Sequence, residues 1–241
     1  MCVVFLAYKV LAEYPLILIA NRDEFYDRPA LPIGWWEDEP DIYAGRDLIG
    51  GGTWLGVTRG GRFAAVTNYR DPAAPMGRRS RGQLISDFLR SEQTVDEYMH
   101  ALQRSRREFS PFNLIAGIIG ANNSEIAYFS DRTDRASTLN PGIYGLSNHI
   151  LDTPWPKVLK GKLRFEELLY RGRPSDESLF DILTDRKPAR DEELPETGIS
   201  YEREKALSSI FIETPDYGTR CSTLLKFDSK GKWRMQERTH V

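Results

Sequence analysis

Segments with strand character alternate in groups with segments of helical spacing, and this order constrains the fold more than any other feature. Short apolar runs predict strands, and apolar residues three and four apart predict helices. Strands are expected at 2–10, 15–20, 53–58, 62–69, 113–120, 125–130, 142–147, 220–227 and 232–238, and helices at 81–90, 94–107, 154–170, 175–183 and 201–211. Runs of strands and runs of helices predict an α+β domain with antiparallel sheets and helices on their outer faces.

Several connecting segments add detail. The first two apolar runs predict a hairpin, so the polar residues 21–24 are expected at a strand end beside the chain start. Residues 29–40 are rich in Trp and Pro and are expected to be irregular, as is the charged segment 186–200. The glycines at 50–52 precede a strand rather than a helix. This favours a sharp turn or a close backbone approach over a phosphate-binding loop.

Length and composition indicate one folded unit. The 241 residues, 40% of them hydrophobic, suffice for one large core, and we expect a single domain over residues 1–241. The formal net charge of −2 argues against a general affinity for nucleic acid. No segment approaches the roughly 20 apolar residues of a membrane helix. The apolar start is interrupted by Lys9 and Glu13, which favours folded structure over a signal peptide. A cytoplasmic location is therefore expected.

Few residues are available for metal or triad chemistry. Cys2 and Cys221 lie far apart, and His100, His149 and His240 lack the spacing of metal ligands. We therefore expect no metal and no other cofactor. The absence of a G-x-S-x-G sequence argues against a serine triad on a nucleophile elbow. Two cysteines are too few for a disulfide-stapled secreted scaffold, so a reducing compartment is favoured.

Cys2 is notable because of its position. Removal of Met1 would leave a cysteine with both a thiol and a free α-amine, whose ordinary pKa is about 7.7–8.0. The amine can then act as the base and the thiolate as the nucleophile, so that no histidine is needed. Position alone favours the simpler interpretation, a small buried cysteine at the start of a strand.

Three further segments accompany Cys2 in a fixed order. They are 21–24 (NRDE), 49–56 with 63–70 (IGGGTWLG and FAAVTNYR), and 217–223 (YGTRCST). Together these blocks resemble the NRDE, or transport-and-Golgi-organisation, family. That family is similar to the cysteine-type N-terminal nucleophile (Ntn) hydrolases, such as penicillin V acylases, bile salt hydrolases and acid ceramidase-like amidases. The resemblance implies an Ntn-hydrolase-like four-layer αββα sandwich of antiparallel sheets.

The resemblance also implies an amidohydrolase that cleaves a non-peptide C–N amide bond of a small acylated molecule. Cys2 matches the nucleophile, and Asp23 matches an aspartate that holds its amine and thiol. Asn68 matches an oxyanion-hole asparagine, Asn148 a second active-site asparagine, and Arg220 an arginine near the thiolate. Simpler structural roles stay open for Asp23, Asn68, Asn148 and Arg220. Examples are an ion pair between Asp23 and Arg28 and helix capping by Asn148.

One position departs from those enzymes, which place an arginine three residues before the aspartate. Ala20 stands there in this sequence. The arginine is Arg22 instead, and its side chain is expected to point elsewhere because adjacent strand residues face opposite sides. The expected substrate-pocket residues are Arg22, Trp54 and Tyr69.

A second function is compatible with the same fold. The resemblance associates eukaryotic members with Golgi organisation and secretion, and other members with haem trafficking. This implies the alternative of a non-catalytic, ligand-handling protein, although no Cys-Pro haem-binding dipeptide occurs. The expected partner is a small-molecule substrate or ligand. Haem and a second copy of the chain stay open as partners, whereas nucleic acid and a transmembrane segment are not expected.

Overall fold

Two antiparallel sheets form the centre of the computed structural model, which describes residues 2–121, 123–133 and 135–241. The first sheet has the order β10 (Gly142–Leu146), β1 (Cys2–Tyr8), β2 (Leu16–Phe25), β11 (Tyr217–Phe227) and β12 (Trp233–Thr239). The second has the order β3 (Ala30–Trp35), β4 (Ile42–Asp47), β5 (Leu55–Thr58), β6 (Arg62–Asn68), β7 (Phe112–Ile119), β8 (Ser124–Ser130) and β9 (Ser137–Thr138).

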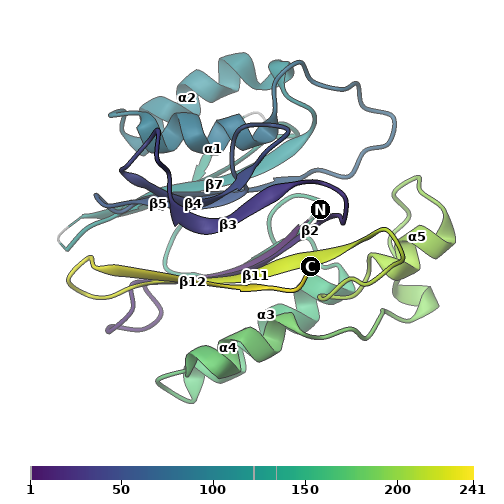
Figure 1. The fold of residues 1–241 in the computed structure, drawn as a ribbon. Coiled ribbons are helices and arrows are strands. Elements are labelled where there is room, and N and C mark those ends of the chain that lie inside the picture. Colours follow the sequence, from purple (N-terminus) through teal and green to yellow (C-terminus); the bar gives the residue numbers. More distant parts are fainter. Residues whose placement is uncertain (1, 122, 134) are drawn as a thin grey trace.

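Helices cover the outer face of each sheet, and the result is a four-layer αββα sandwich (Figure 1). The second sheet carries α1 (Arg81–Arg90) and α2 (Val95–Ser105), which continues into a 3₁₀ turn at Arg106–Glu108. The first sheet carries α3 (Pro156–Tyr170) and α4 (Asp176–Leu183). The remaining helical segments are Asp191–Glu193 and α5 (Tyr201–Ala206). None of the helices in the described residues is long and apolar enough to cross a membrane.

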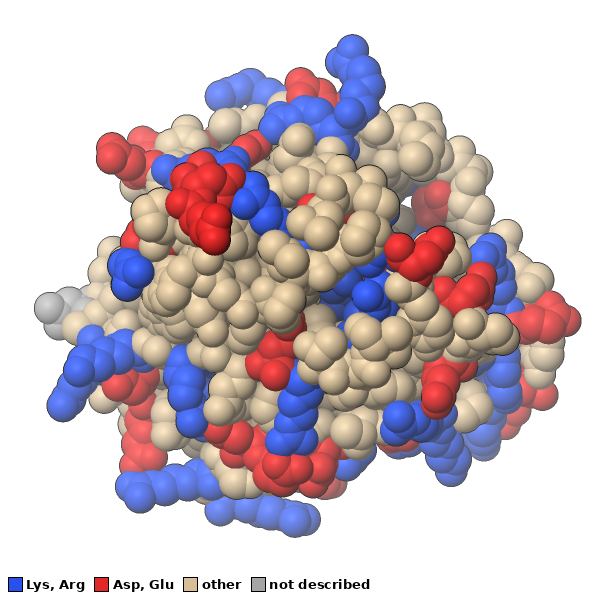
Figure 2. Space-filling view, viewed as in Figure 1, with Lys and Arg blue, Asp and Glu red and all other residues tan. Residues whose placement is uncertain are grey.

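The hydrophobic core has three layers, which follow from the alternation of side chains along each strand. In β2, Leu16, Leu18 and Ala20 face the second sheet and pack in the core between the sheets. Ile17 and Ile19 face the opposite way and pack against α3 and α4. A third cluster lies between the second sheet and α1 and α2. On the face shown in Figure 2, charges of both signs are interspersed, and basic atoms also lie in a hollow right of its centre.

Helix positions were predictable because their signals are local. The helix expected at 81–90 is α1, and the expected capping box at the start of α2 is present, with Thr94 and Glu97 bonded reciprocally. The helix expected from Pro154 begins instead at Pro156. Proline disfavours the helical conformation of the residue before it. Trp155 precedes Pro156 and therefore remains extended, and the helix starts after it.

Two strand predictions were wrong. The strand expected at 15–20 continues to Phe25, so the polar residues 21–24 lie inside β2 rather than beyond its end. The β1 ladder holds one edge of this segment and the β11 ladder holds the other, which keeps it extended despite its polarity. The segment 29–40 contains β3 and is therefore only partly irregular. Its Pro32 is tolerated because β3 is an edge strand with a register shift at that point.

The glycine run forms a close backbone contact, as expected. A side chain at Gly52 would place its Cβ 2.3 Å from the carbonyl carbon of Gly82. Gly51 has φ of 71°, which favours glycine. The run therefore lets the β4–β5 connection pack directly against the start of α1.

Candidate active site

The register of the first sheet positions Cys2. It lies directly opposite Arg22 in the β1–β2 ladder, and opposed residues of an antiparallel pair share a face. This is the face of β2 that points toward the second sheet. Cys2 and Arg22 line a cavity of about 390 Å³ together with Trp54, Asn68 and Arg81. A cavity of this size is within the range of small-molecule sites.

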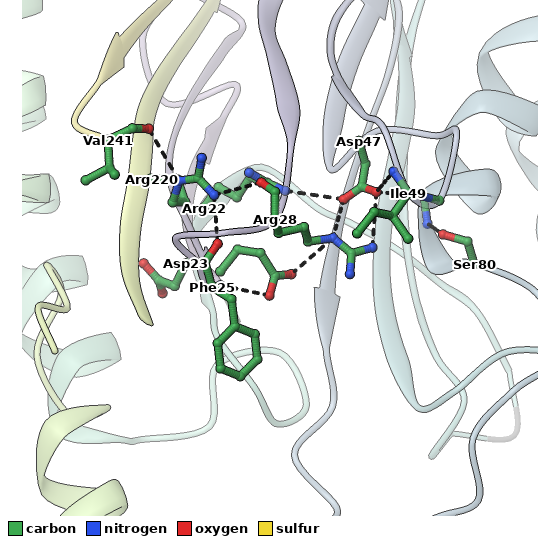
Figure 3. A network of polar contacts seen from close by, with 12 residues as sticks. Arg22, Asp23, Phe25, Arg28, Asp47, Ile49, Ser80, Arg220 and Val241 are labelled. Carbon is green, nitrogen blue, oxygen red and sulfur yellow. Dashed lines mark hydrogen bonds and ion pairs between the residues drawn. The ribbon is translucent and has the colours of Figure 1, made fainter. Parts of the chain in front are cut away.

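Arg22 does not point away from the site, contrary to the expectation. It shares a face with Ala20, two residues earlier, because strand side chains alternate with a period of two. Its guanidinium carbon lies 4.1 Å from the centroid of the Trp54 ring, and its Nη2 donates to Asp47 Oδ2 at 3.3 Å (Figure 3). Arg22 therefore brings a guanidinium to the face where Ala20 has none.

Asp47 organises the cavity wall beside Arg22. Arg28 donates to both of its carboxylate oxygens, with Nε at 2.6 Å and Nη2 at 3.1 Å, and the Gly50 amide donates at 2.6 Å (Figure 3). Burial opposes ionisation, but these bonds and charges hold the pKa of Asp47 below its ordinary value. Arg28 also approaches Glu24 at 3.8 Å. Its partners are thus Asp47 and Glu24 and not Asp23.

Asp23 follows Arg22 in β2, is buried, and also lines the Cys2 cavity. The Thr219 hydroxyl donates to Asp23 Oδ1 at 2.7 Å, and the Tyr217 hydroxyl donates to the backbone carbonyl of Asp23 at 2.9 Å. Burial raises the pKa of the Asp23 carboxyl to about 6, against an ordinary value of 3.8. This carboxyl therefore changes charge close to neutral pH.

Lys157 is a buried cation that the sequence-based interpretation missed. Its side chain is 3% exposed, and its Nζ has no hydrogen-bond partner in the described part of the chain. Burial lowers the pKa of Lys157 to about 8, although the nearby charges of Asp23, Cys2 and Glu204 favour the charged form. An unpaired ammonium in such a position is costly for the fold and is typical of functional sites.

Replacement of Lys157 by methionine is expected to stabilise the fold at neutral pH. The pKa of Lys157 is depressed in the folded state, so folding opposes its charged form below pH 8 and that penalty disappears between pH 8 and 10.5. We expect Lys157→Met to raise the free energy of unfolding by about 1–3 kcal/mol at pH 7, with a smaller gain at pH 10. Urea unfolding at both pH values measures this.

Lys160→Met is the matched control on the same helix. Lys160 is partly exposed and pairs with Asp185, so its replacement should change the free energy of unfolding by less than about 1 kcal/mol. A Lys157→Met protein that is less stable than the unmodified chain at pH 7 would contradict the unpaired state of this ammonium.

The two candidate asparagines are neighbours with different surroundings. Asn68 ends β6 and lines the cavity, and its side-chain amide makes no hydrogen bond to any described residue. Asn148 is fully buried, and its Nδ2 donates to the backbone carbonyl of Asn68 at 3.1 Å. Its Oδ1 accepts from the Ser147 hydroxyl at 3.2 Å. Asn148 is therefore placed to hold Asn68 rather than to reach into the cavity.

Arg220 is not brought to the Cys2 cavity. The β2–β11 register shifts between Thr219 and Cys221, so Arg220 occupies a β-bulge, which redirects its side chain. Its Nη1 donates to the backbone carbonyls of Phe25 at 2.7 Å and Arg28 at 2.9 Å (Figure 3). It lines a neighbouring cavity of about 120 Å³ with Cys221, and Arg22 and Trp54 belong to the walls of both cavities.

Tyr69 also lies outside the described lining of the Cys2 cavity. Its ring packs 4.9 Å from the ring of His149, and the Arg132 guanidinium lies 5.1 Å from its centroid. The Nδ1 of His149 in turn contacts the Thr153 hydroxyl at 2.8 Å. His149 is thus held by a hydrogen bond within the protein.

Other charged residues of the cavity wall lie outside the sequence-based expectations. They are Glu24, Arg28, Asp47, Arg78, Arg79 and Arg81. Three of the arginines belong to the short basic segment just before and at the start of α1. That segment was the one available signal, but a basic run is more often a solvated surface than a cavity wall.

The chain resembles proteins of one family along its whole length. A family model described as Transport and Golgi organisation 2 matches residues 1–241. The transport and Golgi organization protein 2 homologs of Bos taurus and Homo sapiens are 36% and 34% identical over 256 residues. In both cases the match covers 99% of this chain and 93% of the relative. The Drosophila melanogaster protein is 27% identical over 260 residues, and the match covers 99% of this chain and 92% of that protein.

Two solved structures share the fold. The Caenorhabditis elegans ortholog of N-acylethanolamine-hydrolyzing acid amidase matches with a TM-score of 0.53 and 15% identity, covering 93% of this chain and 92% of that one. A mutant conjugated bile acid hydrolase from Clostridium perfringens matches with a TM-score of 0.55 and 7% identity, covering 100% of this chain and 97% of that one. The expected Ntn-hydrolase-like fold is thus confirmed. By its full-length match, the chain belongs to the transport and Golgi organisation 2 family.

Proposed function

We propose that this protein is an amidohydrolase that uses Cys2, as the first residue of the processed chain, to cleave a non-peptide C–N amide bond of a small acylated molecule. The observation that carries the proposal is the pair formed by Cys2 and Asn68 in one cavity. The Asn68 amide has no partner in the described protein, so it is available to a ligand there. The fold shared with two enzymes named as an amidase and a bile acid hydrolase supports the same conclusion.

The chemistry would run in two stages. The Cys2 thiol passes its proton to the α-amine, and the thiolate attacks the amide carbonyl to form a C–S bond. Asn68 donates to the oxyanion that develops, and the ammonium gives its proton to the leaving nitrogen as the C–N bond breaks. Water then attacks the thioester with the amine as base. The acid departs, and the proton held by the amine returns to sulfur.

The electrostatics of Cys2 explain why a base is required. Burial raises the pKa of the Cys2 thiol, so that the thiol is protonated at neutral pH. A hydrogen bond from the Asp23 backbone and the charge of Arg22 act in the opposite direction and favour the thiolate. Proton transfer to an adjacent amine would produce the thiolate only when the substrate is in place.

The dependence on processing gives the sharpest test of this proposal. Natural protein should have the intact mass expected after loss of Met1, and purified protein that begins at Cys2 should release amine from N-acyl compounds. Protein that keeps Met1 should be inactive, because its α-amine belongs to another residue. A thioester adduct on Cys2, seen by mass spectrometry, would report the first stage. Equal turnover by both forms would exclude Cys2 as its own base.

Ligand handling without hydrolysis is the second candidate. It is supported by the raised pKa of the Cys2 thiol, which suits an unreactive cysteine, and by relatives named for transport and Golgi organisation. In the Met1-free protein, tight binding of N-acyl compounds without amine release would favour it. For haem, a Soret shift on titration that is lost in Cys2→Ala would indicate ligation in this cavity.

A further inference from the structure

We infer that the ligand of the Cys2 cavity carries an anionic group, a carboxylate or a phosphate, and that Arg81 binds it. This substrate class rests on the proposed function for its chemistry, but it concerns binding and can be tested without turnover. The evidence is the charge distribution of the cavity wall and the surroundings of Arg81.

The cavity wall contains five arginines and three acidic residues, and most of the arginines are neutralised. Arg22 and Arg28 share Asp47, as described above. Arg79 also lines the cavity but pairs with two carboxylates, with its Nη2 2.6 Å from Asp87 and its Nη1 3.4 Å from Glu108. These three guanidinium groups are therefore already paired within the protein.

Arg78 and Arg81 remain without an ion pair to any described residue. Arg78 is exposed at the rim, where an unpaired arginine is ordinary and needs no ligand. Arg81 differs because it is only partly exposed, and burial lowers its pKa. A guanidinium that has lost much of its hydration is stabilised by an anion more than an exposed one is.

The hydrogen bonds of Arg81 leave most of its donors available. Its Nη1 donates to the backbone carbonyl of Pro111 at 3.2 Å, which is its one side-chain hydrogen bond to the described residues. A guanidinium has five N–H donors, and its planar fork matches the two oxygens of a carboxylate or a phosphate. Because Arg81 lines the cavity, the remaining donors can meet a ligand there.

The position of Arg81 relative to Cys2 limits where the anionic group can be. Both residues line the cavity, and the charge of a Cys2 thiolate is close enough to favour the charged form of Arg81. A ligand whose carbonyl lies at Cys2 can therefore place its anionic group at Arg81 inside the same cavity. In Figure 2, basic atoms lie within a hollow of the surface, so positive charge on this protein is not confined to its outer rim.

A binding experiment on the Cys2→Ala protein tests the inference. Calorimetry would compare three ligands with one acyl chain: an N-acylglycine, the neutral N-acylethanolamine and an N-acyl-O-phosphoethanolamine. We expect at least one anionic ligand to bind roughly 10- to 100-fold more tightly than the neutral one. The difference between the first and third ligands identifies carboxylate or phosphate as the preferred group.

Variants of the two neighbouring arginines separate a specific contact from general charge. Arg81→Gln should remove most of the anion preference, whereas Arg79→Gln, which removes the same charge from the same segment, should keep it. Arg81→Lys retains the charge but loses the planar fork, and it should recover only part of the preference. If Arg81→Gln fails to fold, the lysine variant and the ligand series still give the answer.

Several outcomes would overturn the inference. Equal affinity for neutral and anionic ligands would do so, as would an equal loss of preference in Arg79→Gln and Arg81→Gln. These results are distinguishable from failure of the proposed function. Anion-selective binding by a protein that never releases amine would reject hydrolysis alone, and turnover of neutral amides only would reject the anionic substrate alone.

Discussion

Replacing Cys2 with alanine is expected to abolish amide hydrolysis by the processed protein. The substitution removes the atom that would form the bond to the substrate carbonyl, and loss of a catalytic nucleophile lowers kcat on the order of 10⁶-fold. The free energy of unfolding should change by no more than about 1 kcal/mol, because Cys2 is half-buried at the first position of β1. Amine release and urea unfolding measure the two effects.

Cys221→Ala provides the matched control for this variant. Cys221 is the other cysteine of the chain, is buried in β11, and lines the cavity that contains Arg220 rather than the Cys2 cavity. Burial raises the pKa of its thiol well above the ordinary value, so it is unsuited to nucleophilic attack at neutral pH. Activity should survive in this variant. Activity that persists in Cys2→Ala but is lost in Cys221→Ala would contradict the prediction, because it would assign the reaction to the cavity of Cys221 and Arg220.

The layered fold was predictable because most of its signals are local or periodic. The helix at 81–90 and the capping box at Thr94 are set by side chains within a few residues of one another. Strand order could not be obtained in this way. The polar residues 21–24 are extended because β11, nearly two hundred residues later, pairs with them. Such a contact leaves no trace in the local pattern, so propensity alone ends the strand too early.

The candidate site was predictable only in part, for a related reason. Cys2, Arg22 and Asn68 meet in one cavity because strand alternation places them on facing surfaces, and Trp54 joins them from the connection just before β5. Arg220 is absent from it because a β-bulge interrupts that alternation, and a bulge is not visible in sequence periodicity.

Lys157 and Arg81 were not predicted as site residues, because basic side chains are ordinarily assigned to the surface. Lys157 stands four residues before Gly161 and eight before Phe165, on the buried stripe of α3. Helical spacing therefore predicts that it faces the core, although a lysine is ordinarily assigned to the surface. Arg81 lies in a basic run whose members have different partners, so composition could not distinguish it from Arg79.

Asp23→Asn is expected to make the protein more stable and less active. The pKa of Asp23 is raised in the folded state, so the fold favours the neutral carboxyl and is destabilised as Asp23 ionises between about pH 4 and 6. Asparagine removes this penalty, which amounts to about 1–3 kcal/mol at pH 7 once the lost attraction to Lys157 is allowed for. The gain should shrink below pH 4, where both states of the unmodified protein bind the proton.

The activity of the same variant should fall by roughly 10³- to 10⁴-fold, as when an orienting aspartate is replaced in a catalytic triad. In the unmodified processed protein, kcat/KM should decline below about pH 6 as Asp23 takes up a proton. Thr219→Val removes a hydrogen bond that favours the carboxylate, so the acid limb should move to higher pH. The exposed Asp41 pairs only loosely with Arg59, and Asp41→Asn should leave stability and the pH profile unchanged. An acid limb that stays in place in Thr219→Val would show that another group controls it, and Asp23 would then have a structural role alone.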